Sequence, residues 1–280
     1  MSEVLEVSVD WLSLREPEDA RARAGVLADA VPGLLGAGRG DAGDRRRVVV
    51  HDLGSGTGSM MRWLAPRLPG PQTWVLHDWN PALVARASEG RRPRDASGRP
   101  VELRSRIGEL DALDPSALDG ASLVTASALL DVLTAAEAHA IVAACLSARA
   151  PVLLSLSVTG DVELTPWDAR DIRFARAFNA HQRREVAGRR LLGRYGAPIV
   201  LGLFRQAGWR VRTALTTWRL DARDRLLLAE WFDGWTDAAL EQEPALRREA
   251  AGYRQLRRAQ QERGKLSAVV YHLDLLAWPR

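Results

Sequence analysis

The stretch Val48-Val-Val-His-Asp-Leu-Gly-Ser-Gly-Thr-Gly-Ser59 decides the fold. Three β-branched residues at its start predict a buried strand. Glycines then alternate at positions 54, 56 and 58, and apolar residues follow at helical spacing: Met60, Met61, Trp63 and Leu64. The pattern is typical of a buried strand, a tight turn and the start of a helix whose backbone amides face whatever binds above the turn.

Strand-like and helical segments alternate along the chain after this stretch. Four further strands are predicted at 73–78, 101–107, 122–127 and 151–158. The third alternates apolar and polar residues like an edge strand, and the fifth is nearly continuously apolar like a central parallel strand. Thr134-Ala-Ala-Glu137 has the spacing of a capping box before an Ala-rich helix. The alternation predicts an α/β doubly wound sheet.

The flanking segments complete the expected domain organisation. We expect an N-terminal helical cap and linker at 1–47, whose helices lie over a ligand cleft and whose end, 36–47, is rich in Gly, Asp and Arg. The main domain is 48–280. It contains a substrate-side insertion at 160–197 and a helical insertion at 222–263 before the last strand. The following elements are also expected: helices at 167–186 and 198–208, and strands at 209–220 and 267–278.

Composition places the chain among ordinary globular proteins. Its 280 residues suffice for a full core, and 46% apolar with 26% charged residues is an average balance. No apolar run approaches the roughly 18–20 residues of a membrane span. The N-terminus, Met-Ser-Glu-Val-Leu-Glu, lacks a secretory pattern, and the single cysteine, Cys145, excludes an internal disulfide or a cysteine-built zinc site. A cytoplasmic protein is the simplest interpretation.

The basic balance is mild and rests almost wholly on arginine. The net charge is +4, and Lys265 is the only lysine. Arginine favours carboxylate and phosphate recognition, although a compositional bias towards Arg and Ala explains the same numbers. The excess alone does not indicate a nucleic-acid binder.

Two features together resemble a known cofactor site. Asp52-Leu-Gly-Ser-Gly-Thr-Gly58 and Asp78, the acid that ends the second strand, resemble the site of class I S-adenosylmethionine-dependent methyltransferases. The resemblance covers about 48–278. It implies a seven-stranded, mostly parallel sheet whose last strand inserts antiparallel beside the sixth. It also implies S-adenosyl-L-methionine as cofactor, S-adenosyl-L-homocysteine as product and no metal.

The resemblance assigns roles to individual cofactor-binding residues. Asp52 faces the cationic end of the cofactor, and the glycines let the backbone approach, because any Cβ would collide with the ligand. Asp78 accepts bonds from the ribose hydroxyls, unless it merely caps a helix, and Trp79 packs on the adenine, unless it is a core residue. Glu109, with Asp111 as its rival, reads the adenine amine. The full set implied is Asp52, Gly54, Ser55, Gly56, Gly58, Asp78, Trp79, Glu109, Leu110 and Ser127.

Catalytic candidates come from two segments. Methyl transfer from a sulfonium is an in-line displacement, so a base is needed only where the acceptor must lose a proton. Asp131, after the fourth strand, is placed to orient an acceptor, or else it is a helix-entry acid. His181 is the candidate base of the insertion, with Tyr195 as its substitute, although a histidine on an arginine-rich helix is more often a surface or packing residue.

The insertion also carries the clues to the acceptor. Four arginines form a candidate clamp for an anion, or a solvated face: Arg183, Arg184, Arg190 and Arg194. Trp167 and Phe178 are candidate walls for an aromatic acceptor, or core residues. We therefore expect a small-molecule acceptor, anionic or aromatic. The acceptor atom, O, N or C, and the oligomeric state stay open.

Three other functions compete with this interpretation. A nicotinamide-dependent oxidoreductase also uses a glycine turn, but Ser59 fits its pattern poorly and no Tyr-x-x-x-Lys pair exists. An RNA methyltransferase would use the basic charge, but no appended RNA-binding module is visible. A non-catalytic scaffold that binds the cofactor is the third. No Asn/Asp-Pro-Pro-Tyr/Phe motif, cysteine nucleophile after the fourth strand or acidic magnesium cluster is present.

Overall fold

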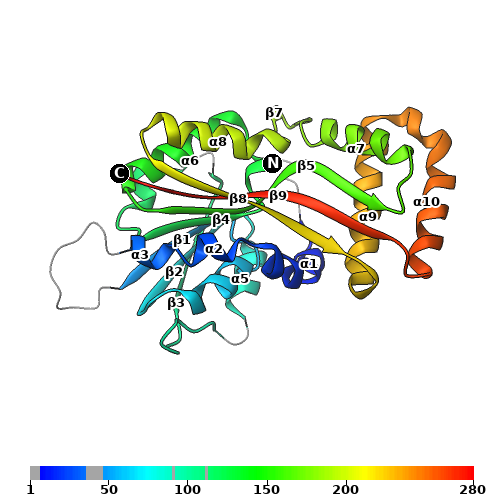
Figure 1. Cartoon of the computed structure of the whole chain (residues 1–280). Coiled ribbons are helices and arrows are strands. Elements are labelled where there is room, and N and C mark those ends of the chain that lie inside the picture. The colour runs from blue at the N-terminus through cyan, green and yellow to red at the C-terminus, as the bar shows by residue number, and fades with distance from the viewer. Residues whose placement is uncertain (1–6, 36–46, 90–91, 111–112) are drawn as a thin grey trace.

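One mixed sheet organises the molecule. The computed structural model describes residues 7–35, 47–89, 92–110 and 113–280. Within these, seven strands form a sheet in the order β3-β2-β1-β4-β5-β9-β8 (Figure 1). The first five are parallel, and β9 is antiparallel to both of its neighbours, β5 and β8. The strands are β1 (Val48–Leu53), β2 (Gln72–Asp78), β3 (Glu102–Ile107), β4 (Leu123–Ser127), β5 (Val152–Thr165), β8 (Arg210–Leu220) and β9 (Ser267–Trp278).

This topology confirms the predicted fold. The sheet is doubly wound and mostly parallel, and the last strand lies antiparallel beside the strand that precedes it in the sequence, as the resemblance implies. The third strand is at the sheet edge, as its alternating pattern predicts.

Helices cover both faces of the sheet. The α-helices are α1 (Val9–Ala22), α2 (Gly25–Ala28), α3 (Val31–Leu34), α4 (Ser59–Leu64), α5 (Pro81–Ser88), α6 (Ala135–Ala148), α7 (Arg170–His181), α8 (Gly196–Gln206), α9 (Arg225–Gln242) and α10 (Arg247–Glu262). The predicted capping box of α6 is present, because Thr134 and Glu137 each bond the backbone of the other.

Strand residues alternate between two apolar cores. Val124, Val152 and Leu154 belong to the core under α6 and α8, whereas their neighbours Leu123 and Leu153 belong to the core under α2 to α5. Successive side chains of a strand point to opposite faces, so a strand buried on both faces reads as continuously apolar.

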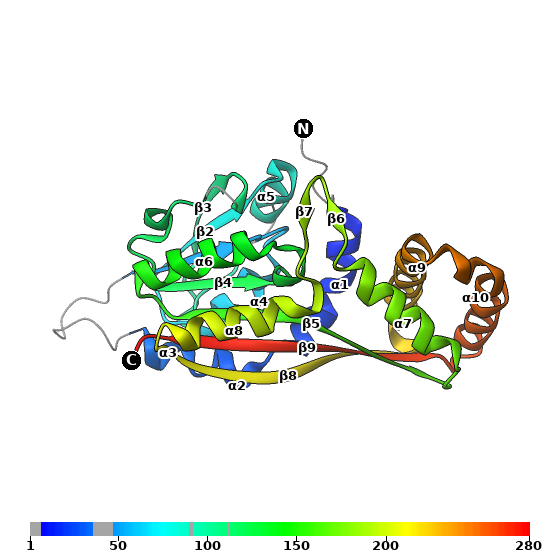
Figure 2. The same cartoon turned by 90° about the horizontal axis from the view of Figure 1, so that it is seen from above.

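The three longest strands carry a third core away from the rest of the sheet. β5, β8 and β9 extend beyond the other strands, and α7, α9 and α10 gather around their far ends (Figures 1 and 2). Trp218, Phe174, Trp235 and Tyr253 are buried there. β5 pairs with β9 as far as Thr165, so the predicted insertion at 160–197 begins inside a strand.

The insertion also differs from the single helix expected at 167–186. α7 ends at His181, and a short hairpin follows, with β6 (Glu185–Val186) paired to β7 (Arg189–Arg190). Ala187 and Gly188 form its turn with φ of 51° and 79°. Positive φ at both central residues is what a type I′ hairpin turn requires, and the glycine supplies it without strain.

Two further expectations concern other parts of the chain. The linker predicted at 36–47 lies, apart from Arg47, outside the described residues. No helix in the described ranges is both long enough and apolar enough to cross a membrane.

A buried ion pair joins α7 to α10. The Arg257 side chain is fully buried, and its guanidinium donates to both carboxylate oxygens of Asp171 and to the carbonyl of Pro166. Tyr253 donates its hydroxyl to the same carboxylate at 2.6 Å. Because these helices build the third core, the pair fixes the far end of the three long strands.

Arg257→Met should therefore lower the free energy of unfolding by about 3–5 kcal/mol, because it leaves the Asp171 carboxylate without its countercharge. Urea unfolding of the two proteins measures the difference. Arg258→Met is the matched control, since the neighbouring Arg258 pairs with Asp233 at the surface. Equal effects of the two substitutions would show that the buried pair contributes no more than a surface pair.

Candidate functional site

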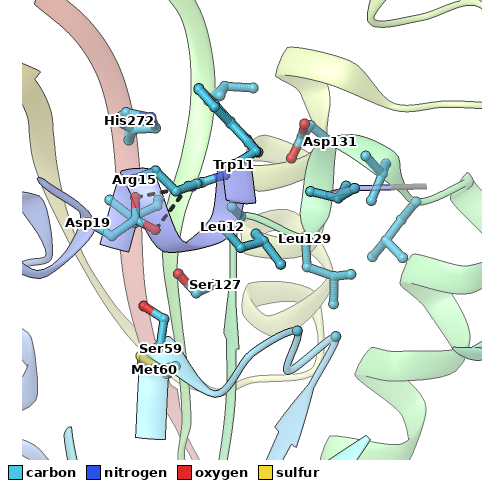
Figure 3. A pocket seen from close by; sticks show the side chains of 18 of the residues that line it. Trp11, Leu12, Arg15, Asp19, Ser59, Met60, Ser127, Leu129, Asp131 and His272 are labelled. Atoms are coloured by element: carbon cyan, nitrogen blue, oxygen red, sulfur yellow. Dashed lines mark hydrogen bonds and ion pairs between the residues drawn. The ribbon is translucent and has the colours of Figure 1, made fainter. Parts of the chain in front are cut away.

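A cavity of about 410 Å³ opens at the carboxyl ends of β1, β2 and β4 and continues beneath α1 towards the third core. Parallel sheets bind ligands at this edge, where the strand order reverses on either side of β1. Figure 3 shows part of its lining, with Asp131 on the side opposite His272. The lining includes nine of the ten predicted cofactor-binding residues: Asp52, Gly54, Ser55, Gly56, Asp78, Trp79, Glu109, Leu110 and Ser127.

The glycine turn between β1 and α4 forms one wall. Gly54 and Gly56 have φ of 60° and 51°, a left-handed conformation that disfavours other residues. A Cβ on Gly54 would lie 2.8 Å from a methyl carbon of Leu129, and one on Gly56 would lie 3.3 Å from Leu12. The turn is therefore tight against its surroundings even without a ligand.

Gly58, the tenth predicted residue, has a different place. It does not line the cavity, and a Cβ there would lie 3.1 Å from Ala87 of α5 and 3.2 Å from Met61. Gly58 is the N-cap residue of α4 and has a left-handed φ of 82°. The structure thus assigns Gly58 to close packing of α4 against α5, and we do not retain it as a cofactor contact.

Asp78 joins the end of β2 to the glycine turn. Its carboxylate accepts the amide of Gly56 at 2.8 Å and the amide of Asn80 at 3.0 Å. The helix cap of α5 is Asn80, which accepts the amide of Ala82. Asp78 is therefore not the helix cap that its sequence position also allowed, and its carboxylate faces the cavity.

Asp52 lies at the bottom of the cavity. One carboxylate oxygen accepts the hydroxyl of Thr125 at 2.6 Å, and the other, Oδ2, is buried without a hydrogen-bond partner among the described residues. Burial raises the pKa of Asp52 to about 7, against the opposing effects of Thr125 and the Arg23 guanidinium. A buried oxygen with no partner is ready to accept a bond from a ligand.

The predicted adenine side of the site is open to solvent. Trp79 and Glu109 are exposed and Leu110 is partly exposed, and all three line the cavity. Asp111, the alternative to Glu109, lies outside the described residues.

The other end of the cavity is aromatic. Trp231 and Trp235 of α9 stack with ring centroids 5.7 Å apart, and Trp11 lies 6.3 Å from Trp218. Phe178 completes this wall. We call these five residues the aromatic compartment. Sequence reasoning found one of them, Phe178.

Three residues of the cavity lining carry polar atoms without partners. Asp131 Oδ1, His272 Nδ1 and Trp235 Nε1 are buried, and the described residues offer none of them a hydrogen bond. Burial raises the pKa of Asp131 to about 6, and burial together with Arg15 lowers the pKa of His272 to about 3. At neutral pH Asp131 is thus a carboxylate and His272 is uncharged.

His181 and Tyr195, the other two catalytic candidates, lie outside the cavity lining. His181 Nδ1 accepts a bond from Arg184, and its Nε2 lies 3.1 Å from Glu241 of α9. Tyr195 is exposed, with the guanidinium groups of Arg183 and Arg194 on its ring. Both therefore have structural partners, and we do not retain them as bases.

The arginine clamp and one aromatic wall are also absent from the cavity. Arg183, Arg184, Arg190 and Arg194 do not belong to its lining, and Trp167 is 71% exposed. The arginine of the hairpin that does line it, Arg189, is bound by Glu137 at 2.8 Å. The described residues hold no group of three or more His, Cys, Asp or Glu side chains suited to a metal ion.

Several lining residues escaped sequence reasoning because they come from the ends of the chain. Arg15, Asp19 and Arg23 of the α1 segment are spaced four residues apart, and all three face the cavity. That spacing on a predicted cap helix was the available signal. Trp218 and His272 come from β8 and β9, and nothing local in those strands marks them as site residues.

Comparisons with known proteins find similar folds. Neither a protein-family model nor a curated protein sequence matches the chain significantly. A solved cyclopropane-fatty-acyl-phospholipid synthase-like protein from Lactobacillus casei has a TM-score of 0.49 and 13% identity, with 98% of this chain and 96% of that chain covered. A SAM-dependent methyltransferase from Geobacter sulfurreducens, solved in complex with S-adenosyl-L-homocysteine, has a TM-score of 0.43 and 15% identity, with 99% and 100% covered.

An O-methyltransferase family protein from Burkholderia thailandensis has a TM-score of 0.40 and 20% identity over 68% of this chain, which spans 52% of that protein. With TM-scores below 0.5 and identities of 20% or less, these similarities assign neither an activity nor a substrate to the chain.

The pKa of Asp52 predicts a pH-dependent stability. Because burial holds it near 7 instead of 3.8, the folded protein keeps a proton there that the unfolded chain releases, and stability is lost as pH rises between these values. Asp52→Asn should match the parent protein at pH 4 and exceed its stability at pH 8 by at most about 4 kcal/mol. Melting temperatures across this range measure the difference.

Asp168→Asn provides a control of opposite sign. The hydrogen bond from Arg170 lowers the pKa of Asp168 to about 2, so this variant should be less stable than the parent at pH 8 and should approach it only as pH falls towards 2. A difference for Asp52→Asn that is constant with pH would mean that Asp52 is ionised throughout.

Proposed function

We propose that the chain is an S-adenosylmethionine-dependent methyltransferase that acts on a small aromatic molecule. The observation that carries the proposal is the joining of Asp78 to the glycine turn through the Gly56 amide, with the unpartnered Asp52 Oδ2 in the same cavity. These groups suit the two ends of the cofactor: Asp78 the ribose hydroxyls, and Asp52 the methionine ammonium.

When bound, the cofactor supplies a methyl group activated by the sulfonium. The residues of the chain would hold its two ends, with Trp79 and Leu110 against the adenine and Glu109 accepting from the adenine amine. Ser127 lines the cavity at the end of β4, and it would flank the reacting centre. Positioning of this kind supplies much of the acceleration in an in-line displacement.

The aromatic compartment supports the choice of a small aromatic acceptor. Its Trp and Phe rings offer flat apolar surfaces, and its few polar groups are isolated ones that fix an orientation, as in other small-molecule sites. The arginines that reach it are paired, Arg15 with Asp19 and Arg189 with Glu137. Neither an anionic acceptor nor an RNA strand is favoured by such a lining.

Asp131 is the base that this site offers. Its unpartnered oxygen is buried in the cavity wall, and Arg15 is the charged group that acts on it. A carboxylate with a pKa near 6 is ionised at neutral pH and still accepts a proton from a hydroxyl in the transition state.

Cofactor binding is the first test. S-adenosylhomocysteine should raise the melting temperature of the protein and NAD or NADP should not, and Asp78→Ala should weaken S-adenosylhomocysteine about 10- to 100-fold in calorimetry. Asn80→Ala is the matched control: it removes the helix cap at a cost of about 1 kcal/mol of stability and should leave the affinity unchanged. Stabilisation by a nicotinamide dinucleotide instead would identify an oxidoreductase.

Methyl transfer from labelled S-adenosylmethionine to a panel of small phenols and aromatic amines is the second test. The rate at low acceptor concentration should rise tenfold per pH unit below about 6 and level off above it, since Asp131 must be ionised. Asp131→Asn should be about 100-fold slower or more and should lose this dependence. His181→Gln and Tyr195→Phe should behave like the parent protein. Cofactor binding without transfer to any acceptor would favour a non-catalytic scaffold.

A further inference from the structure

Arg23, which directly follows α1, is a buried cation beside the glycine turn. Its side chain is 1% exposed and belongs to the cavity lining. Nη2 donates to the hydroxyl of Ser59 at 2.9 Å and to the hydroxyl of Ser127 at 3.1 Å. Nε also donates to Ser127, at 3.4 Å, and the third nitrogen, Nη1, is buried without a hydrogen-bond partner in the described part of the chain.

The charge of Arg23 is incompletely balanced. The nearest carboxylate is Asp19, 3.9 Å away, but Arg15 already binds both of its oxygens at 3.0 and 3.2 Å. Trp218 donates to the same carboxylate. Two guanidinium groups therefore share the Asp19 carboxylate. The carboxyl groups of Asp52 and Asp274 also attract Arg23, but neither accepts a hydrogen bond from it among the described residues. Burial lowers the pKa of Arg23, yet a guanidinium stays protonated at neutral pH, so Arg23 is a buried cation with no carboxylate at hydrogen-bond distance.

Backbone contacts on both sides hold Arg23 in place. Its own amide donates to the carbonyl of Asp19 at 3.0 Å, and the next amide, that of Ala24, donates to the buried Asp274 carboxylate at 2.9 Å. The guanidinium is thus positioned before any ligand arrives, which reduces the entropy lost on binding.

We propose that Arg23 binds the amino-acid carboxylate of the cofactor, so that the N-terminal helical segment is part of the cofactor site. The inference rests on the proposed function. Arg23 Nη1 is an unpartnered cationic donor and Asp52 Oδ2 is an unpartnered carboxyl oxygen, both on residues that line one cavity, and an amino-acid zwitterion carries a matching acceptor and donor. The carboxylate would accept from Arg23 and the ammonium would donate to Asp52.

The test compares two ligands that differ by one group. S-adenosylhomocysteine carries the carboxylate, and its decarboxylated analogue, S-adenosyl-3-thiopropylamine, keeps the amine and the nucleoside. By calorimetry, the wild-type protein should bind the first about 10- to 100-fold more tightly. Arg23→Gln should abolish this preference and should change the affinity for the analogue less than threefold. In a thermodynamic cycle, this result shows that the residue and the ligand carboxylate interact directly.

Arg62→Gln is the matched control, because Arg62 also ties the α1 segment to the turn and α4. It donates to Glu16 of α1 and to the carbonyl of Thr57, each at 2.6 Å, but does not line the cavity. It should keep the full preference for the carboxylate. Arg23→Lys, which keeps the charge but not the planar fork, should retain part of it, and serves if Arg23→Gln melts below the assay temperature.

Each contrary outcome has a separate meaning. If Arg23→Gln weakens both ligands equally, or neither, Arg23 is a packing residue and the inference falls while the proposed function stands. The same holds if the wild-type protein binds both ligands equally well. If the wild-type protein binds neither ligand, the proposed function fails as well.

Discussion

The carboxylate of Asp274 holds together four segments that lie far apart in the sequence. One oxygen accepts the amide of Leu156 at 2.7 Å and the hydroxyl of Thr216 at 3.1 Å, and the other accepts the amide of Ala24 at 2.9 Å. The residue is fully buried in β9, and burial raises its pKa. Leu156 has a φ of 56° in an irregular part of β5, where its amide is not taken up by the β9 ladder. A side chain without a carboxylate at 274 would leave buried amides without acceptors, so the bend of β5 and the placement of the N-terminal segment depend on the same group.

Because Asp274 bonds the N-terminal segment to β5, β8 and β9, residues from both ends of the chain line the same cavity as the glycine turn. From Ala24 backwards, Arg23, Asp19 and Arg15 follow at four-residue spacing and share the face of α1 that covers the cavity. Trp218 of β8 donates to Asp19 at 3.1 Å, which joins the same helix to the aromatic compartment. The glycine turn and Asp78 alone would form an open groove at the edge of the sheet. The α1 segment covers that groove, and the long strands position α9, with its aromatic side chains, at the far end.

The parts of this structure that the sequence predicts are the ones whose causes are local. Contiguous sequence patterns predict β1, the turn and β2, and Asp78 is predicted because it ends a strand. The three glycines look alike in the sequence, yet Gly58 faces Ala87 instead of the cavity, and that difference depends on how α5 packs. His181 shows the same limit: the rotation of α7 turns it towards Glu241, sixty residues later, and no local pattern reports this. The four-residue spacing of Arg15, Asp19 and Arg23 indicates a shared helix face, but it does not report the environment of Arg23, which residues from β4, α4 and β9 make.

The arrangement of charge gives the cavity its direction. In the protein alone, an aspartate with a pKa near 7 and a buried arginine each lack a partner for one atom, which lowers stability. Asp52 and Arg23 attract each other, but no hydrogen bond joins them among the described residues. A ligand that carries one charge binds one of these two atoms and leaves the other without a hydrogen-bond partner. A ligand that binds both groups binds the folded state and therefore stabilises it. The opposite end offers flat aromatic surfaces, with the buried carboxyl group of Asp131 also in the cavity wall, so the two ends of the cavity differ in polarity.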